Sequence, residues 1–283
     1  MSFQDKLLDS FIAFEQVIDL DNPIHTDRKN ALKRFESKGF PTKKDELWKY
    51  TSLKSITQKD YSLSVKNNPN VGLKDIKKYS INDIDSYKIV FVDGVFNPFL
   101  SNTTHDGMDV CVLSAALSKS KYKKTINKYF NNIVPDDQSL ASLNTSYTQE
   151  GAYIHIPKSV LPEDPVQILH FSSGKNKPLW LQPRNIIIVE ENARVEIIER
   201  HQSLRTHDGV TNSLTEIYAE KNSFIDYYKI QNDLETSNLI DNTFIDQQRD
   251  SNVRVHTFSF GGKLTRNNLN FYHKGENIQS TLK

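Results

Sequence analysis

Cysteine is almost absent from this chain, whose one thiol is that of Cys111. A single cysteine cannot form an intrachain disulfide, and this fits a protein of the reducing cytosol. It also limits metal chemistry, because an iron–sulfur cluster ordinarily takes about four protein ligands, mostly thiolates, and structural zinc sites are typically rich in cysteine. The chain alone therefore cannot hold a cluster by thiolates. Cys111 lies in the apolar run 110–113, where a cysteine is expected to be a small buried hydrophobe and not a reactive thiol.

Long apolar runs and an excess of charge of one sign are also absent. No stretch of the 283 residues reaches the ~18 consecutive apolar positions that a membrane-spanning helix needs. The first residues carry no basic segment that leads into an apolar one, so a secretory signal is not expected. The 36 basic and 35 acidic residues leave a net charge of +1, which predicts neither nucleic acid nor an anionic membrane as a partner. We expect a cytoplasmic protein.

Recognisable catalytic motifs are missing as well. The chain has no Gly-x-Ser-x-Gly and no His-Glu-x-x-His. Gly261-Gly262 lacks the frame of a phosphate-binding loop, so we interpret this pair as a bend or a close approach of two backbones. The adjacent acidic pairs 136–137 and 190–191 make no carboxylate dyad, because neighbours in a strand point to opposite faces. The sequence thus predicts no catalytic residue and no ATP site, and we expect a protein that is not an enzyme.

The first half of the chain, residues 1–148, is predicted to be a mixed domain with mainly helical character. Apolar spacing predicts helices over 3–19, 27–37, 121–130 and 136–146.

Capping residues suggest where some of these helices begin and end. Thr26 is a candidate N-cap for the second helix, and Gly39 is its stop. Thr42 with Asp45 resembles a capping box. It would open a short helix that carries two aromatic residues, 48 and 50, and we expect both rings in the core.

The second half, residues 149–283, is predicted to consist of short strands. The expected strands are 152–156, 166–171, 185–189, 194–199, 214–219, 224–231, 253–260 and 269–272. Asparagines at 192, 222 and 252 link strands at intervals of 30 residues, and Asn277 follows after 25. A fixed interval with a short turn is typical of a solenoid. A β-sandwich or jelly roll would also give many short strands, although it would not require a common interval.

Several motifs in this order resemble the SufD branch of the SufB/SufD family, which acts in the SUF system of iron–sulfur cluster assembly. The motifs are Phe40-Pro41 through Tyr50-Thr51; Phe91-Val92-Asp93-Gly94-Val95-Phe96 with Leu100-Ser101; Leu140, Leu143 and Asn144 before Gly151; 165–170; 184–189 with 191–193 and 197–199; 228–231; and Phe260-Gly261-Gly262 with Arg266-Asn267. The resemblance implies a right-handed parallel β-helix preceded by a helical domain, so a mainly β protein with an α-rich N-terminal region.

The resemblance also implies a scaffold role in a complex with SufB and two copies of the SufC ATPase. It implies that this chain alone holds no cofactor tightly, that a cluster is bound only transiently, and that flavin, where it associates, does so at the level of the complex. Self-association of the full-length form stays open. The resemblance also implies that members of this family continue beyond the point where this sequence stops, with a C-terminal part that carries the contacts with SufC and most of the contacts with SufB. We therefore expect a C-terminally truncated chain whose last coil is left without a polar cap.

Candidate binding residues are few, and each has an ordinary structural alternative. His170 and His201 are 31 residues apart, so they would stack on adjacent coils, but two imidazoles without a third ligand do not predict a metal site. His201 is expected beside a loop. Arg184 and Arg266 are suited to phosphate or flavin, while an ion pair is the commoner role of such residues. The sequence therefore assigns no metal ligand and no cofactor-binding residue.

Two other functions fit the same pattern of strands. One is a β-helix enzyme that acts on polysaccharides, which would require charged side chains gathered on one coil face. The other is a binding solenoid without any connection to metals.

Overall fold

The computed structural model describes residues 2–63, 71–79, 81, 84–103, 107–175 and 177–283. Its helices are α1 (Phe3–Glu15), α2 (His25–Lys38), α3 (Lys54–Thr57), α4 (Leu73–Ile76), α5 (Leu113–Ser118), α6 (Ser120–Tyr129) and α7 (Ser139–Ser146), with 3₁₀ turns at Glu46–Trp48, Lys77–Tyr79 and Pro98–Leu100. Its strands are β1 (Tyr87–Val92), β2 (Val95–Phe96), β3 (Asp109–Val112), β4 (Ala152–Ile156), β5 (Val166–Ser172), β6 (Trp180–Leu181), β7 (Arg184–Val189), β8 (Arg194–Ser203), β9 (Val210–Ala219), β10 (Phe224–Asn232), β11 (Asn238–Gln247), β12 (Asn252–Ser259), β13 (Leu264–His273) and β14 (Gln279–Leu282).

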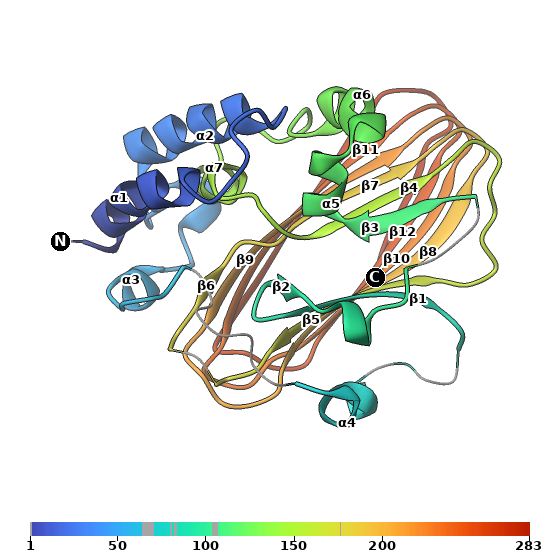
Figure 1. The fold of residues 1–283 in the computed structure, drawn as a ribbon. Helices are drawn as coiled ribbons and strands as arrows, with labels where there is room; N and C mark the ends of the chain where they lie inside the picture. The colour runs from blue at the N-terminus through green and yellow to red at the C-terminus, as the bar shows by residue number, and fades with distance from the viewer. Residues whose placement is uncertain (1, 64–70, 80, 82–83, 104–106, 176) are drawn as a thin grey trace.

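From β7 onward, successive strands alternate between two facing sheets (Figure 1). Sheet one has the order β14-β12-β10-β8-β5-β1-β2, and sheet two has the order β13-β11-β9-β7-β4-β3, with β6 beside β9. Neighbours pair in parallel except at β1–β2 and β3–β4. The predicted parallel β-helix is confirmed.

The turns that join the two sheets stack on one another. Asn192, Asn222, Asp250 and Asn277 have φ of 61°, 54°, 60° and 55°, a region that asparagine and aspartate tolerate. The amide of Asn222 donates to the side chain of Asn192 (2.8 Å), and that of Asn277 donates to Asp250 (3.0 Å). The predicted turn at Asn252 was wrong, because Asn252 is the first residue of β12 and Asp250 takes the left-handed position.

The apolar core inside the solenoid is built from alternating positions of both sheets. These positions carry mainly isoleucine and valine, among them Ile168, Ile187, Ile197, Ile217 and Ile225. Sheet two is also covered on its outer side by α5, α6 and α7, whose apolar residues pack on β4, β7, β9 and β11. Strand β11 is consequently buried along its whole length, which is why it shows no alternation of polar and apolar residues and escaped prediction.

The N-terminal predictions were confirmed in part. Gly39 ends α2 with φ of 66°, as expected of a helix stop. Thr26 is not the N-cap, because α2 begins at His25 and Ile24 precedes it. Trp48 is buried, but the expected core position of Tyr50 was wrong, since 91% of that residue is exposed.

Strands from the first half of the chain join both sheets. β1 pairs in parallel with β5, and β3 pairs with β4. The domain boundary between residues 148 and 149 stays a prediction. Within the described parts of the chain, no helix is long and apolar enough to cross a bilayer.

Gly151, just before β4, provides a test of how closely the coils approach. It has φ of 151°, and a Cβ added there would lie 1.8 Å from the backbone oxygen of Arg184. We predict that Gly151→Ala lowers the free energy of unfolding by at least about 2 kcal/mol, measured by chemical denaturation. Gly72→Ala is the control, because an added Cβ meets no atom within 4 Å, and it should cost at most about 1 kcal/mol. Equal losses in the two variants would contradict the close approach.

Candidate functional site

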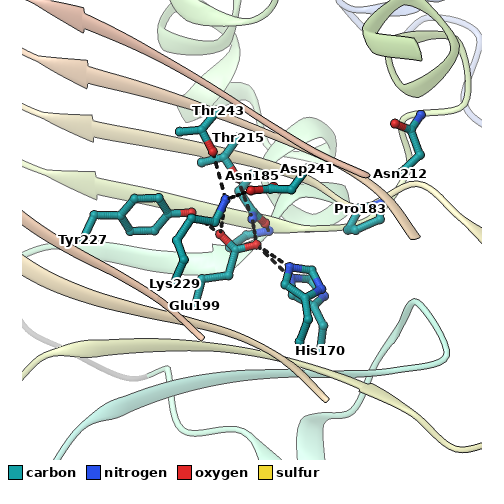
Figure 2. A network of polar contacts seen from close by, with 12 residues as sticks. His170, Pro183, Asn185, Glu199, Asn212, Thr215, Tyr227, Lys229, Asp241 and Thr243 are labelled. Carbon is teal, nitrogen blue, oxygen red and sulfur yellow. Dashed lines mark hydrogen bonds and ion pairs between the residues drawn. The ribbon is translucent and has the colours of Figure 1, made fainter. Parts of the chain in front are cut away.

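A buried polar network fills the part of the lumen that follows the apolar core along the strands (Figure 2). Its side chains come from β5, β8 and β10 of sheet one and from β7, β9 and β11 of sheet two. They are His170, Asn185, Glu199, His201, Thr215, Tyr227, Lys229, Asp241 and Thr243. Since buried polar groups are costly unless they are paired, the contacts within this network show how the fold retains them.

Glu199 lies at the centre of the network and is fully buried. Its Oε2 accepts from the Tyr227 hydroxyl, and its Oε1 contacts His201 Nε2 at 2.9 Å and accepts from Asn185 Nδ2 at 3.3 Å. Burial by itself would raise the pKa of Glu199, but the charge of Lys229 and the contact with His201 hold that pKa well below its ordinary value. Glu199 is therefore an ionised carboxylate inside the solenoid.

Lys229 supplies a positive charge within the same network. Its ammonium group donates to Asp241, donates to Thr243 Oγ1 at 2.9 Å, and lies 3.8 Å from Glu199 Oε2. Burial opposes the charged form, yet the two carboxylates raise the pKa of Lys229. The ion pairs thus connect the two sheets across the lumen.

His170 lies between two other rings. Its ring is stacked on that of Phe91 (centroids 5.0 Å apart) and on that of His201 (4.7 Å). Its Nε2 is 3.8 Å from Glu199 Oε1 and is buried without a hydrogen-bond partner among the described residues. Burial, followed by the neighbouring His201, lowers the pKa of His170 to about 3. The imidazole is consequently uncharged at neutral pH.

A small cavity reaches this ring pair from the side of the β1–β2 turn. It has a volume of about 10 Å³ and is lined by His170, His201 and Gln202, together with Gly94 and Asp233. A cavity of that size accommodates about one water molecule.

The predicted stacking of His170 on His201 is confirmed, because the two residues are register partners in β5 and β8. The expected position of His201 beside a loop was wrong, since it is a buried residue of β8. Sequence reasoning missed Glu199. Its signal was present, because a residue two positions before His201 in a strand points to the same face.

Arg184 makes a buried ion pair and has no exposed surface for phosphate or flavin. It pairs with Glu216, donates to Thr145 Oγ1 of α7 at 2.9 Å, and lies over the ring of Phe130. The ion pair alternative is therefore confirmed, and it joins sheet two to the helices that cover it.

Arg266 binds a different part of the protein, the segment that begins at Thr42. Its guanidinium lies 4.2 Å from the ring centre of Trp48 and donates to the backbone oxygen of Leu47 at 2.6 Å.

At Gly261 two backbones approach closely, as predicted, since an added Cβ would lie 2.2 Å from the backbone oxygen of Asp233. Cys111 is half-buried, not fully buried as expected, and desolvation raises the pKa of its thiol to about 11, so that the thiol is protonated at neutral pH.

The unusual pKa of His170 predicts a dependence of stability on pH. The unfolded chain takes up a proton on this residue near pH 6.5, whereas the folded protein does so only near pH 3. The stability contributed by neutral His170 is therefore present above pH 6.5 and is lost as the pH falls toward 3, with a slope of up to ~1.4 kcal/mol per pH unit. In metal-free protein, His170→Gln should show a shallower loss between these values, measured by urea denaturation.

Ser172→Ala is the matched control, because it changes the same strand without removing a titratable group. It should shift the stability curve without changing its slope. Identical slopes in His170→Gln and the wild type would contradict a neutral buried imidazole.

Comparison with known proteins places the whole chain in one family. The family model for the SufBD protein N-terminal region matches residues 1–168, and that for the SUF system FeS cluster assembly SufBD core domain matches residues 170–283. A SufBD family iron–sulfur cluster assembly protein of Synechocystis is 25% identical over 90% of this chain and 58% of its own length. The iron–sulfur cluster assembly protein SufD of Escherichia coli is 24% identical over 87% and 54%.

The chloroplastic protein ABCI7 of Arabidopsis thaliana is 23% identical over 92% of this chain and 55% of its own length. This chain thus spans little more than half the length of these relatives. The matched regions of the two family models meet within β5 of the solenoid, and together they cover both the helical region and the coils. The chain belongs to the SufBD family.

Proposed function

We propose that this chain is part of a non-catalytic scaffold subunit of the SUF machinery for iron–sulfur cluster assembly. The observation that carries the proposal is the match of the SufBD N-terminal and core family models to residues 1–168 and 170–283. The parallel solenoid described above agrees with that match. The proposed place of action is the cytoplasm.

The chemistry of the chain supports a scaffold role over a catalytic one. The charged groups of the lumen are engaged with one another, as in the pair of Lys229 and Asp241 and the contact of His201 with Glu199. Charged groups on the outer face of sheet one are also paired, since Asp226 contacts both Arg194 and Arg254. These charged groups contact one another, and their pairing supports a scaffold over an enzyme that acts on polysaccharides.

Partners are proposed on the same basis. SufB and the SufC ATPase would supply the nucleotide chemistry, because the sequence of this chain has no phosphate-binding loop. The cluster would be cargo bound transiently by the complex, because the single thiol of this chain cannot provide about four ligands. Flavin, if bound, would belong to the assembled complex.

The test is co-purification. The longest form of this protein that its gene encodes, with a tag that contains no histidine, is co-expressed with SufB and SufC of the same organism and sized by gel filtration. We predict a complex that contains all three proteins, as the proposed scaffold role requires. An unrelated β-solenoid with the same tag controls for adhesion through exposed strand edges. Absence of both SufB and SufC from the purified material would refute the proposal.

A further inference from the structure

We propose that His170, Glu199 and His201 form a binding site for one divalent transition-metal cation inside the solenoid. The inference does not depend on the role in cluster assembly. It concerns a cation resident in this chain and not the iron of a cluster.

The three candidate ligands are brought together by the register of the coils. His170 and His201 are paired residues of adjacent strands, and Glu199 lies two positions before His201 on the same face of β8. One ligand atom from each of the three lies within 4.8 Å of the other two. All three side chains are buried, and the two imidazole rings are stacked nearly parallel (11°), so one ring must turn for both Nε2 atoms to face a single ion.

An unsatisfied nitrogen points to a missing ligand at this place. Nε2 of His170 is buried, has no hydrogen-bond partner among the described residues, and lies 3.8 Å from Glu199 Oε1. Since a buried polar atom without a partner is costly, the fold would be expected to supply one. A cation between the imidazole and the carboxylate would satisfy both.

The surrounding groups orient the carboxylate toward the two rings. Tyr227 and Lys229 approach Glu199 through Oε2, whereas Oε1 is the oxygen nearest to both imidazoles. Lys229 in turn is held by Asp241 and Thr243. Oε1 is therefore the carboxylate oxygen placed to bind a cation together with the two imidazoles.

The ligand set also determines which ions fit. Two imidazoles and a carboxylate suit zinc, iron(II) or cobalt(II), whereas magnesium and calcium prefer oxygen ligands only. The cavity of about 10 Å³ that is lined in part by His170 and His201 has room for about one water molecule. Three protein ligands completed by a water molecule are common among catalytic zinc sites.

The experiment titrates the purified chain, without a histidine tag and stripped with a chelator, with Co²⁺ and with Zn²⁺. Visible absorption of Co²⁺ and calorimetry with Zn²⁺ report stoichiometry and affinity. We predict one equivalent of each metal, a melting temperature that rises with metal, and at least tenfold weaker binding in both His170→Gln and His201→Gln. His170→Gln is the milder change, because its Nε2 has no hydrogen bond to lose.

His256→Gln is the matched control. This histidine also lies in a sheet-one strand and is also stacked on a ring, that of Tyr228, but it lies outside the cluster. It should keep the wild-type affinity. Absence of binding to the wild type, or binding that His170→Gln and His201→Gln leave unchanged in folded protein, would overturn the proposal.

Discussion

The rest of the structure depends on the parallel, in-register pairing of successive coils. Each strand pairs with the strand one coil away, so residues about 30 positions apart in the sequence become neighbours, as His170 and His201 do in β5 and β8. Because side chains alternate between the two faces of a strand, the same register directs isoleucine and valine into the apolar part of the lumen and polar residues into the adjoining part. The turns follow the same rule, since Asn192 and Asn222 stack through their side chains.

The same register buries polar side chains inside the lumen, and the cost of their burial must be offset by contacts between them. An isolated charge inside a protein costs several kcal/mol, so Glu199 can remain ionised only because Lys229, Tyr227 and His201 surround it. On the outer side of sheet two, Arg184 and Glu216 are also buried, and their charges compensate each other in an ion pair. That pair also contacts α7, so the helices from the first half of the chain and the coils from the second half are stabilised together.

The features predicted correctly from the sequence depend on residues close together in the chain. The features that were missed depend on residues that only the fold brings together. Strands such as β4 and β7 were recognised from their apolar residues, and Gly39 was recognised as a helix stop. Strand β11 was missed because it is covered on both sides, and its inward Asp241 and Thr243 look like loop residues until Lys229 lies beside them. Tyr50 was placed wrongly because the sequence gives no sign of which side of its short segment faces the solvent. At the site, the histidine pair followed from the repeat interval, whereas Glu199 was missed because the predicted strand ended at residue 199, before His201, and β8 continues to Ser203.

The register itself is tested most directly by cross-linking across the turn stack. In a Cys111→Ala background, the pair Asn192→Cys and Asn222→Cys places two thiols on adjacent coils, where side-chain atoms of the native residues lie 2.8 Å apart. The pair Asn192→Cys and Asp250→Cys places them two coils apart, at roughly 10 Å between strands, which is beyond the reach of a disulfide. We predict that mild oxidation forms a disulfide in the first variant and none in the second, as measured by mass spectrometry of proteolytic peptides. Failure of the first pair to cross-link in folded protein, or equal cross-linking of both pairs, would contradict the coil register from which the lumen and its polar network follow.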